Sequence, residues 1–153
     1  MGPATGFRSR DRAAAAPADR PVRIAALVQR GRRGDRVLTE VLSMARSQAV
    51  DVTLVAVVAH ATLRGCAVSP APLNEAIDEA AAADLDAAAM WLPLSVPVRD
   101  RCVLRDRLDP PLAAWVTEHE FDLVLVPGRR RFGRRAPGVA GLAELSDILV
   151  RSI

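Results

Sequence analysis

Short apolar runs alternate with segments of helical periodicity along most of this chain. The runs VRIAALVQ from Val22, DVTLVAVVAH from Asp51 and FDLVLVP from Phe121 are rich in β-branched residues, as expected of strands covered on both faces. Strands that alternate with helices at this spacing favour right-handed crossovers and a parallel sheet. The sequence therefore predicts a small doubly wound α/β domain of the Rossmann type.

The segments between these runs predict the helices and a third strand. Asp35 is a candidate cap for the first helix. The apolar residues of segment 73–92 recur at helical spacing, which predicts the second helix. Residues 96–104 form a shorter and more polar strand, which is typical of a sheet edge. Asp109, followed by Pro110 and Pro111, predicts the start of the next helix.

The C-terminal residues carry a helical pattern, so no fifth strand is expected. The pattern is formed by Leu142, Leu145, Ile148 and Leu149. The predicted strand order is 3-2-1-4, which leaves the apolar fourth strand, FDLVLV, at an exposed edge. Such an edge invites pairing. We therefore expect a homodimer near the fourth-strand edge, or coverage of that edge by the tail or a partner chain.

The 153 residues are enough for one domain. Residues 1–21 have no hydrophobic period and predict a flexible tail, and 22–153 form the domain. Two cysteines are too few for a disulfide framework. Because no run approaches roughly 18 apolar residues and no secretory signal is present, we expect a cytoplasmic protein without direct membrane insertion.

The positive charge is concentrated after the fourth strand. All 21 basic residues are arginines, and five of them lie in Gly128–Arg135 without an acid. In the predicted topology this loop converges with the loop that follows the first strand, at the carboxyl ends of the strands, where open α/β sheets bind ligands. A solvated connection is the competing interpretation. The candidate ligand-binding residues are Gln29, Arg30, Gly31, Val58, His60, Gly128, Arg129, Arg130 and Gly133.

The segment RDRLDPPLAAWVTEHEFDLVLVPGRR resembles the universal stress protein family. It is similar to the family pattern of Gly-Asp-Pro, an amphipathic helix, then Asp-Leu-Ile-Val-Val-Gly and a basic turn. The matching residues are Asp109, Pro110, Asp122, Leu123, Val124 and Gly128, while Leu108 replaces the glycine. The resemblance implies the Rossmann-like fold that stress proteins share with adenine nucleotide alpha hydrolases, and a nucleotide or purine-like compound as the candidate ligand.

Two departures set this chain apart from the nucleotide-binding members of that family. The resemblance implies an aspartate just after the first strand, where this chain has Gln29 and Arg30. It also implies Gly-x-x-Gly and a later Gly-Ser or Gly-Thr after the fourth strand. Here the glycines fall at 128, 133, 138 and 141, without that serine or threonine. The ATP motif is therefore degenerate, and no cofactor is certain.

A related resemblance is to the cytosolic stress-protein-like domains of cation/proton antiporters. The segment AELSDILVRS, with Glu144, Leu145 and Asp147, is similar to the Glu-Leu, Gly-Asp-Leu-Leu helix that ends those domains. That resemblance implies an accessory or regulatory domain docking on a transporter or another protein partner without a nucleotide.

The sequence lacks common catalytic signatures. It has no Gly-x-x-x-x-Gly-Lys loop, no Gly-x-Ser-x-Gly elbow, no His-Glu-x-x-His helix and no signature of the related adenylating enzymes. We expect a non-catalytic module and not an enzyme, with a weak nucleotide hydrolase as a third hypothesis. Nucleic acid is not expected as a partner, because Phe132 alone is interleaved with the basic residues and no helix has a basic face.

Overall fold

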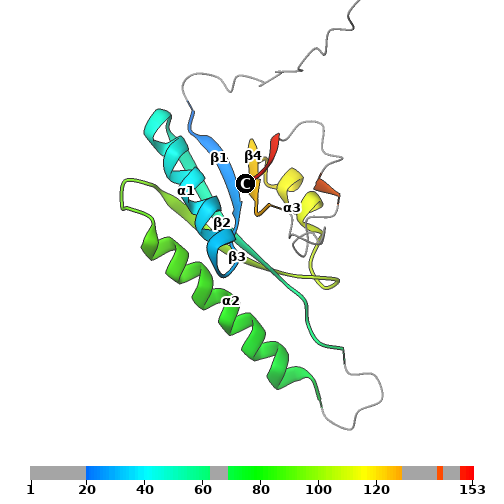
Figure 1. The fold of residues 1–153 in the computed structure, drawn as a ribbon. Coiled ribbons are helices and arrows are strands. Elements are labelled where there is room, and N and C mark those ends of the chain that lie inside the picture. The colour runs from blue at the N-terminus through cyan, green and yellow to red at the C-terminus, as the bar shows by residue number, and fades with distance from the viewer. Residues whose placement is uncertain (1–19, 63–68, 129–140, 143–148) are drawn as a thin grey trace, which may run out of the picture.

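The chain forms one five-stranded sheet with helices on both of its faces (Figure 1). The computed structural model describes residues 20–62, 69–128, 141–142 and 149–153. In chain order the elements are β1 (Val22–Leu27), α1 (Arg32–Ser47), β2 (Val50–Val58), α2 (Ala71–Trp91), β3 (Val98–Arg105), α3 (Leu112–Glu118), β4 (Leu123–Val126) and β5 (Leu149–Ser152).

The strands lie in the order β3-β2-β1-β4-β5, and every neighbouring pair is parallel. Ile24 of β1 lies opposite Val52 of β2 on one side and Leu123 of β4 on the other. The chain therefore winds outward from β1 to β3 and then crosses back to β4. This confirms the predicted doubly wound architecture and the order 3-2-1-4 of the first four strands, with the switch point between β1 and β4.

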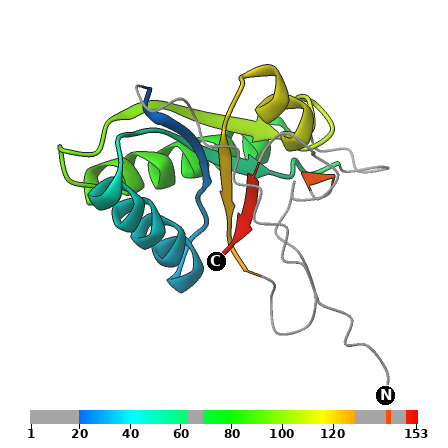
Figure 2. The same cartoon turned by 90° about the horizontal axis from the view of Figure 1, so that it is seen from above.

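Two apolar clusters fill the spaces on either side of the sheet. One joins α1 and α2 to the sheet through residues such as Val41 and Leu85, and the other joins α3 to it through Trp115 and Val116. Figure 2 shows α1 and α2 together on one side and α3 apart from them. Burial on both faces explains why β1, β2 and β4 consist of nearly continuous apolar runs.

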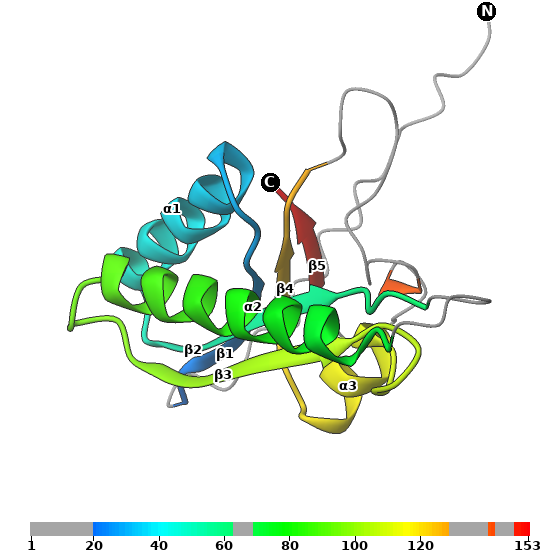
Figure 3. The ribbon, with the colours of Figure 1, turned by 90° about the horizontal axis from the view of Figure 1, so that it is seen from below.

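The prediction that the fifth strand is missing is wrong. β5 pairs with β4 along its whole length, from Leu123 opposite Leu149 to Val126 opposite Ser152 (Figure 3). The helix predicted over 142–149 is therefore incorrect at Leu149, and residues 143–148 lie outside the described residues. A strand forms at 149–152 because β4 is apolar on both faces, and the main-chain groups on its outer side need the partners that β5 supplies. The fourth strand is not an edge, so this basis for a homodimer is removed.

Two predicted helix caps are also wrong. α1 begins at Arg32, after Gly31, because the Gly31 carbonyl accepts the Gly34 and Asp35 N–H groups at 2.9 and 3.3 Å. Asp35 therefore lies in the first turn. α3 begins at Leu112, and the Asp109 carboxylate instead accepts the Arg105 backbone N–H at 2.7 Å.

The prediction that the third strand is an edge strand is confirmed, and carboxylates shield its outer side. Because Asp106 N donates to Val58 O, the main-chain groups of Arg101, Val103 and Arg105 turn away from β2. Asp100 accepts the Arg101 N–H at 2.7 Å, as Asp109 does that of Arg105. Two of these three outward N–H groups are thus occupied, which disfavours strand addition at β3.

The predicted tail falls almost entirely outside the described residues, which begin at Arg20. Arg20 Nη2 lies 2.6 Å from Asp122 Oδ1, and the other oxygen of Asp122 accepts the Arg23 backbone N–H at 2.9 Å. The chain is thereby held to the start of β4 just before it enters β1. Among the described helices, none has the length and apolar character needed to cross a membrane.

Candidate crevice at the carboxyl ends of the strands

The candidate site lies where β1 and β4 end side by side. These two strands are paired through Ala26 and Leu125 near their carboxyl ends, and their chains then leave on different paths. β1 leads into α1, whereas β4 leads to Gly128. Gln29, Arg30, Gly31 and Gly128 therefore lie at the same edge of the sheet, just after two adjacent strands, and their convergence on a ligand stays a prediction. Arg129, Arg130 and Gly133 lie outside the described residues.

The turn from β1 into α1 depends on two glycines. Gly31 has a φ of 88°, and nothing in the described structure lies within 4 Å of where its Cβ would be. Gly34 is buried, and a Cβ there would lie 1.8 Å from the Gln29 carbonyl oxygen. The glycines therefore let the first turn of α1 pack directly on Gln29, while the Gly31 backbone remains open to a ligand.

Gly128 fixes the end of β4 to the end of the chain. Its N–H donates to the Ile153 carbonyl oxygen at 2.5 Å, and Ile153 N donates back to Val126 O at 3.0 Å. A Cβ at Gly128 would lie 2.6 Å from that Ile153 oxygen. The glycine that matches the stress-protein pattern thus allows a close main-chain contact between β4 and the residue after β5.

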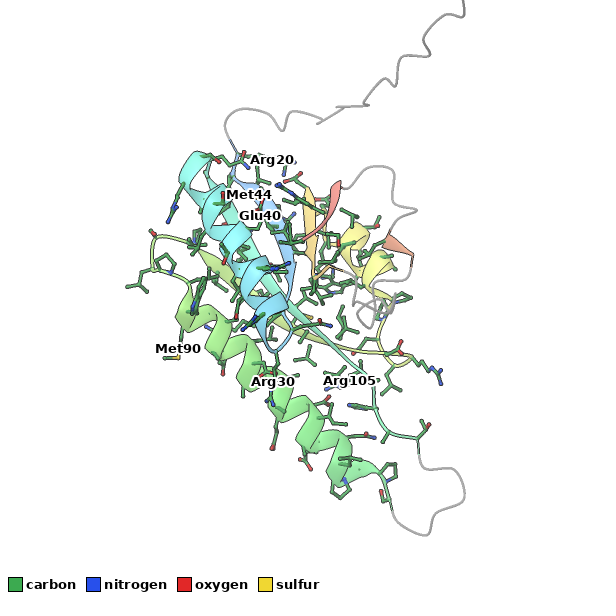
Figure 4. The ribbon with its side chains drawn as sticks, viewed as in Figure 1. Arg20, Arg30, Glu40, Met44, Met90 and Arg105 are labelled. Carbon is green, nitrogen blue, oxygen red and sulfur yellow. The ribbon has the colours of Figure 1, made fainter. Side chains whose placement is uncertain are left out.

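Arg30 is directed toward helix α2 (Figure 4). Its Nε lies 2.8 and 2.7 Å from the two carboxylate oxygens of Asp84, and its side chain is 72% exposed. The charge predicted to face a ligand is therefore shared with an acid of α2. This pairing was not expected from the sequence, because the two residues lie 54 positions apart.

Val58 and His60 lie at the end of β2, the strand that pairs with β1. Val58 closes the strand, and its carbonyl accepts the Asp106 N–H at 2.7 Å. The His60 ring is turned toward α2, where Nε2 lies 2.7 Å from Asp78 Oδ1. With 15% of its side chain exposed, His60 acts mainly as a contact between the loop and the helix. His60 thus follows the carboxyl end of β2, and its role at a ligand site stays a prediction.

Asp78 is the centre of a charged cluster at this edge. Its second oxygen accepts Arg105 Nε at 2.8 Å, so the acid bridges the chain after β2 and the last residue of β3. The hydrogen bond from His60 and the neighbouring Arg105 hold the pKa of Asp78 below its ordinary value. Asp78 in turn raises the pKa of Arg105. One turn earlier, Asn74 binds both backbone groups of Ala61.

The contacts of Asn74 and Asp78 were not predicted, although the sequence contains a signal for them. Both residues continue, at helical spacing, the stripe of buried residues on α2, which includes Ala81 and Leu85. Polar residues in a buried stripe need partners. The helix extends past the sheet here, so these residues bind loop backbone and charged side chains instead of packing on the strands.

The replacement Asp78→Asn is expected to weaken stability in a pH-dependent way. The folded-state pKa of Asp78 is lowered from 3.8, so its charge stabilises the fold above that pH, and the contribution is lost as the pH falls through the lower, folded-state value. Urea unfolding across the acid range should therefore show a gap between wild type and variant that closes at low pH. A gap that stays constant would mean that the ionised form is not the stabilising one.

A pocket lies away from this candidate site. It is an open pocket of about 430 Å³ between α2 and the first half of β3. Its arginines already have partners: Arg101 lies 2.6 Å from Asp86, and Arg99 lies 3.1 Å from Asp51. In the described part of the chain, no group of three histidines, cysteines or acids is placed to hold a metal ion.

The fold is that of universal stress proteins. A family member from Burkholderia pseudomallei superposes with a TM-score of 0.66 at 17% identity, covering 90% of this chain and 98% of that one. An Arabidopsis thaliana member with AMP bound superposes with a TM-score of 0.60 at 10% identity, covering 87% of this chain and 91% of that one. A universal stress protein in complex with cAMP superposes with a TM-score of 0.54 at 12% identity, covering 87% of this chain and 96% of that one. No protein-family model and no curated protein sequence matches this chain.

Proposed function

We propose that this chain is a non-catalytic module that binds a nucleotide or a purine-like compound at the carboxyl ends of β1, β2 and β4. The observation that carries this proposal is the Gln29–Gly34 turn. The exposed Gly31 backbone and the close packing of Gly34 on Gln29 place the start of a 16-residue helix next to the sheet switch point. The first N–H groups of a helix lack intrahelical acceptors and favour negatively charged ligands.

Two neighbours of the same fold support this choice of ligand class, since one has AMP bound and the other is in complex with cAMP. The ligand would be held differently here, because Gln29 and Arg30 follow β1 where the resemblance implies an aspartate. A neutral amide and an arginine change which groups of a base or sugar can be bound. The preferred compound is therefore a purine derivative other than ATP.

An accessory role on a protein partner is the second candidate, and one surface favours it. Met90, Trp91 and Leu94 at the end of α2 are 86, 52 and 105% exposed. Exposed aromatic and long apolar side chains that lie close together are typical of protein interfaces. A cation/proton antiporter and a second copy of this chain are the partners that the sequence suggests, and both stay predictions.

Thermal unfolding with adenine, adenosine, AMP and ATP tests the first proposal. A compound present at a hundredfold excess over its dissociation constant stabilises the fold by about 2.7 kcal/mol, which raises the melting temperature by about 5–10 °C. Ribose 5-phosphate is the matched control, since it carries the phosphate without the base. We expect a shift with at least one purine compound and none with this control.

The outcomes separate the two candidate functions. Equal stabilisation by ribose 5-phosphate and AMP would indicate a general anion site and contradict purine recognition. No stabilisation by any of the compounds would contradict the nucleotide proposal and favour the partner-binding role. Phosphate release from ATP that survives repurification of the protein would contradict the non-catalytic assignment.

A further inference from the structure

The contact between Arg30 and Asp84 has an asymmetry that bears on ligand choice. Arg30 uses only Nε, and its four Nη hydrogens have no partner among the described residues. Its side chain is 72% exposed, whereas that of Asp84 is 31% exposed. Asp84 also precedes Leu85, which is 1% exposed and anchors α2 in the core. The arginine is therefore the more exposed member of the pair, whereas the backbone of Asp84 is held by the packing of α2.

The same arrangement recurs along α2. Arg105, at the end of β3, contacts Asp78, and Arg30, after β1, contacts Asp84. Two arginines at this end of the sheet thus face an aspartate of the same helix. An anion that approaches Arg30 meets a guanidinium whose charge is already compensated.

We propose that the Asp84 carboxylate is an internal competitor that lowers the affinity of the crevice for anionic ligands and so sets its preference between a nucleoside and its phosphates. A ligand phosphate either displaces Asp84 from Arg30 or binds the Nη side of the guanidinium with the carboxylate still close by. Both cases disfavour the phosphate, by loss of the ion pair or by repulsion between like charges. This inference rests on the proposed binding of purine compounds in the crevice.

The test compares AMP and adenosine binding by calorimetry at low salt. Asp84→Asn keeps the size of the side chain and removes its charge, so AMP should bind about three- to tenfold more tightly. Adenosine, which has no phosphate, should bind equally to both proteins. The gain for AMP should shrink as salt is added, because exposed charges are screened.

Asp86→Asn is the matched control. Asp86 lies on the same helix, and its replacement changes the net charge equally, but its partner is Arg101 at the β3 edge. We expect no selective gain for AMP in this variant. In the Asp84→Asn background, Arg30→Ala should remove the gain, which would assign the effect to the released guanidinium.

Three results would overturn the proposal. The first is an equal gain in both asparagine variants, which would make the effect one of overall charge. The second is an unchanged ratio of AMP affinity to adenosine affinity in Asp84→Asn. This result would leave the proposed function in place, because purine compounds still bind. The third is the absence of binding in every variant, which would remove the proposed function together with the inference.

Discussion

Replacing Gly34 with alanine is expected to destabilise the chain by about 3 kcal/mol or more. The new Cβ would lie 1.8 Å from the Gln29 oxygen and 2.9 Å from the Gln29 carbonyl carbon, and both atoms belong to the backbone. No change of rotamer relieves this overlap. The end of β1 or the first turn of α1 must move, so the loss of stability should be accompanied by loss of ligand binding. Urea unfolding followed by circular dichroism measures the first effect.

Gly31→Ala is the control for this prediction. It lies three residues earlier in the same turn and has a φ of 88°, but no described atom lies within 4 Å of the place that its Cβ would take. The cost should therefore be that of backbone strain alone, about 1–2 kcal/mol. If Gly31→Ala proved more damaging than Gly34→Ala, the close contact between α1 and Gln29 would be refuted.

Trp115→Ala is expected to have the other large effect, a loss of about 3–5 kcal/mol. Trp115 is 8% exposed and joins α3 to the sheet, with its ring stacked 4.6 Å from His119 and 5.1 Å from Phe121 between centroids. Removing the indole leaves a cavity on the side of the sheet that only α3 covers among the described helices. The free energy of unfolding of the purified variant measures this loss.

The chain provides its own control in Trp91, which is 52% exposed at the end of α2. Trp91→Ala should change the free energy of unfolding by about 0.5 kcal/mol or less, as is usual for exposed positions. Similar losses for the two variants would contradict the described position of α3. With one tryptophan left in each variant, fluorescence also distinguishes the buried ring from the exposed one.

The sequence correctly predicted the strands that can be recognised from their own residues, without knowledge of the strands they pair with. β1, β2 and β4 are β-branched runs buried on both faces, and β3 is polar enough to be recognised as an edge. β5 was missed because Leu149 fits a helical period as well as a strand. The choice depends on pairing with β4, which lies more than twenty residues earlier in the chain. Such long-range pairing overrides local pattern.

The candidate site shows the same division between local and distant effects. Gly31 was singled out from the sequence as a candidate ligand-binding residue, and the structure gives it a φ of 88° in the turn after β1. The direction of Arg30 was not predictable, because Asp84 lies 54 residues away in sequence. Asp84 and Asp78 of α2 thus contact cations that follow or end other strands, and no local pattern indicates these pairs.

The most direct test of the crevice is a titration of the ¹⁵N-labelled chain with AMP, followed by amide chemical shifts. We expect the largest changes at Gln29, Arg30, Gly31, His60 and Gly128, which lie just after the carboxyl ends of β1, β2 and β4. Changes confined to the pocket between α2 and the first half of β3, or no changes at millimolar AMP, would contradict binding at this edge.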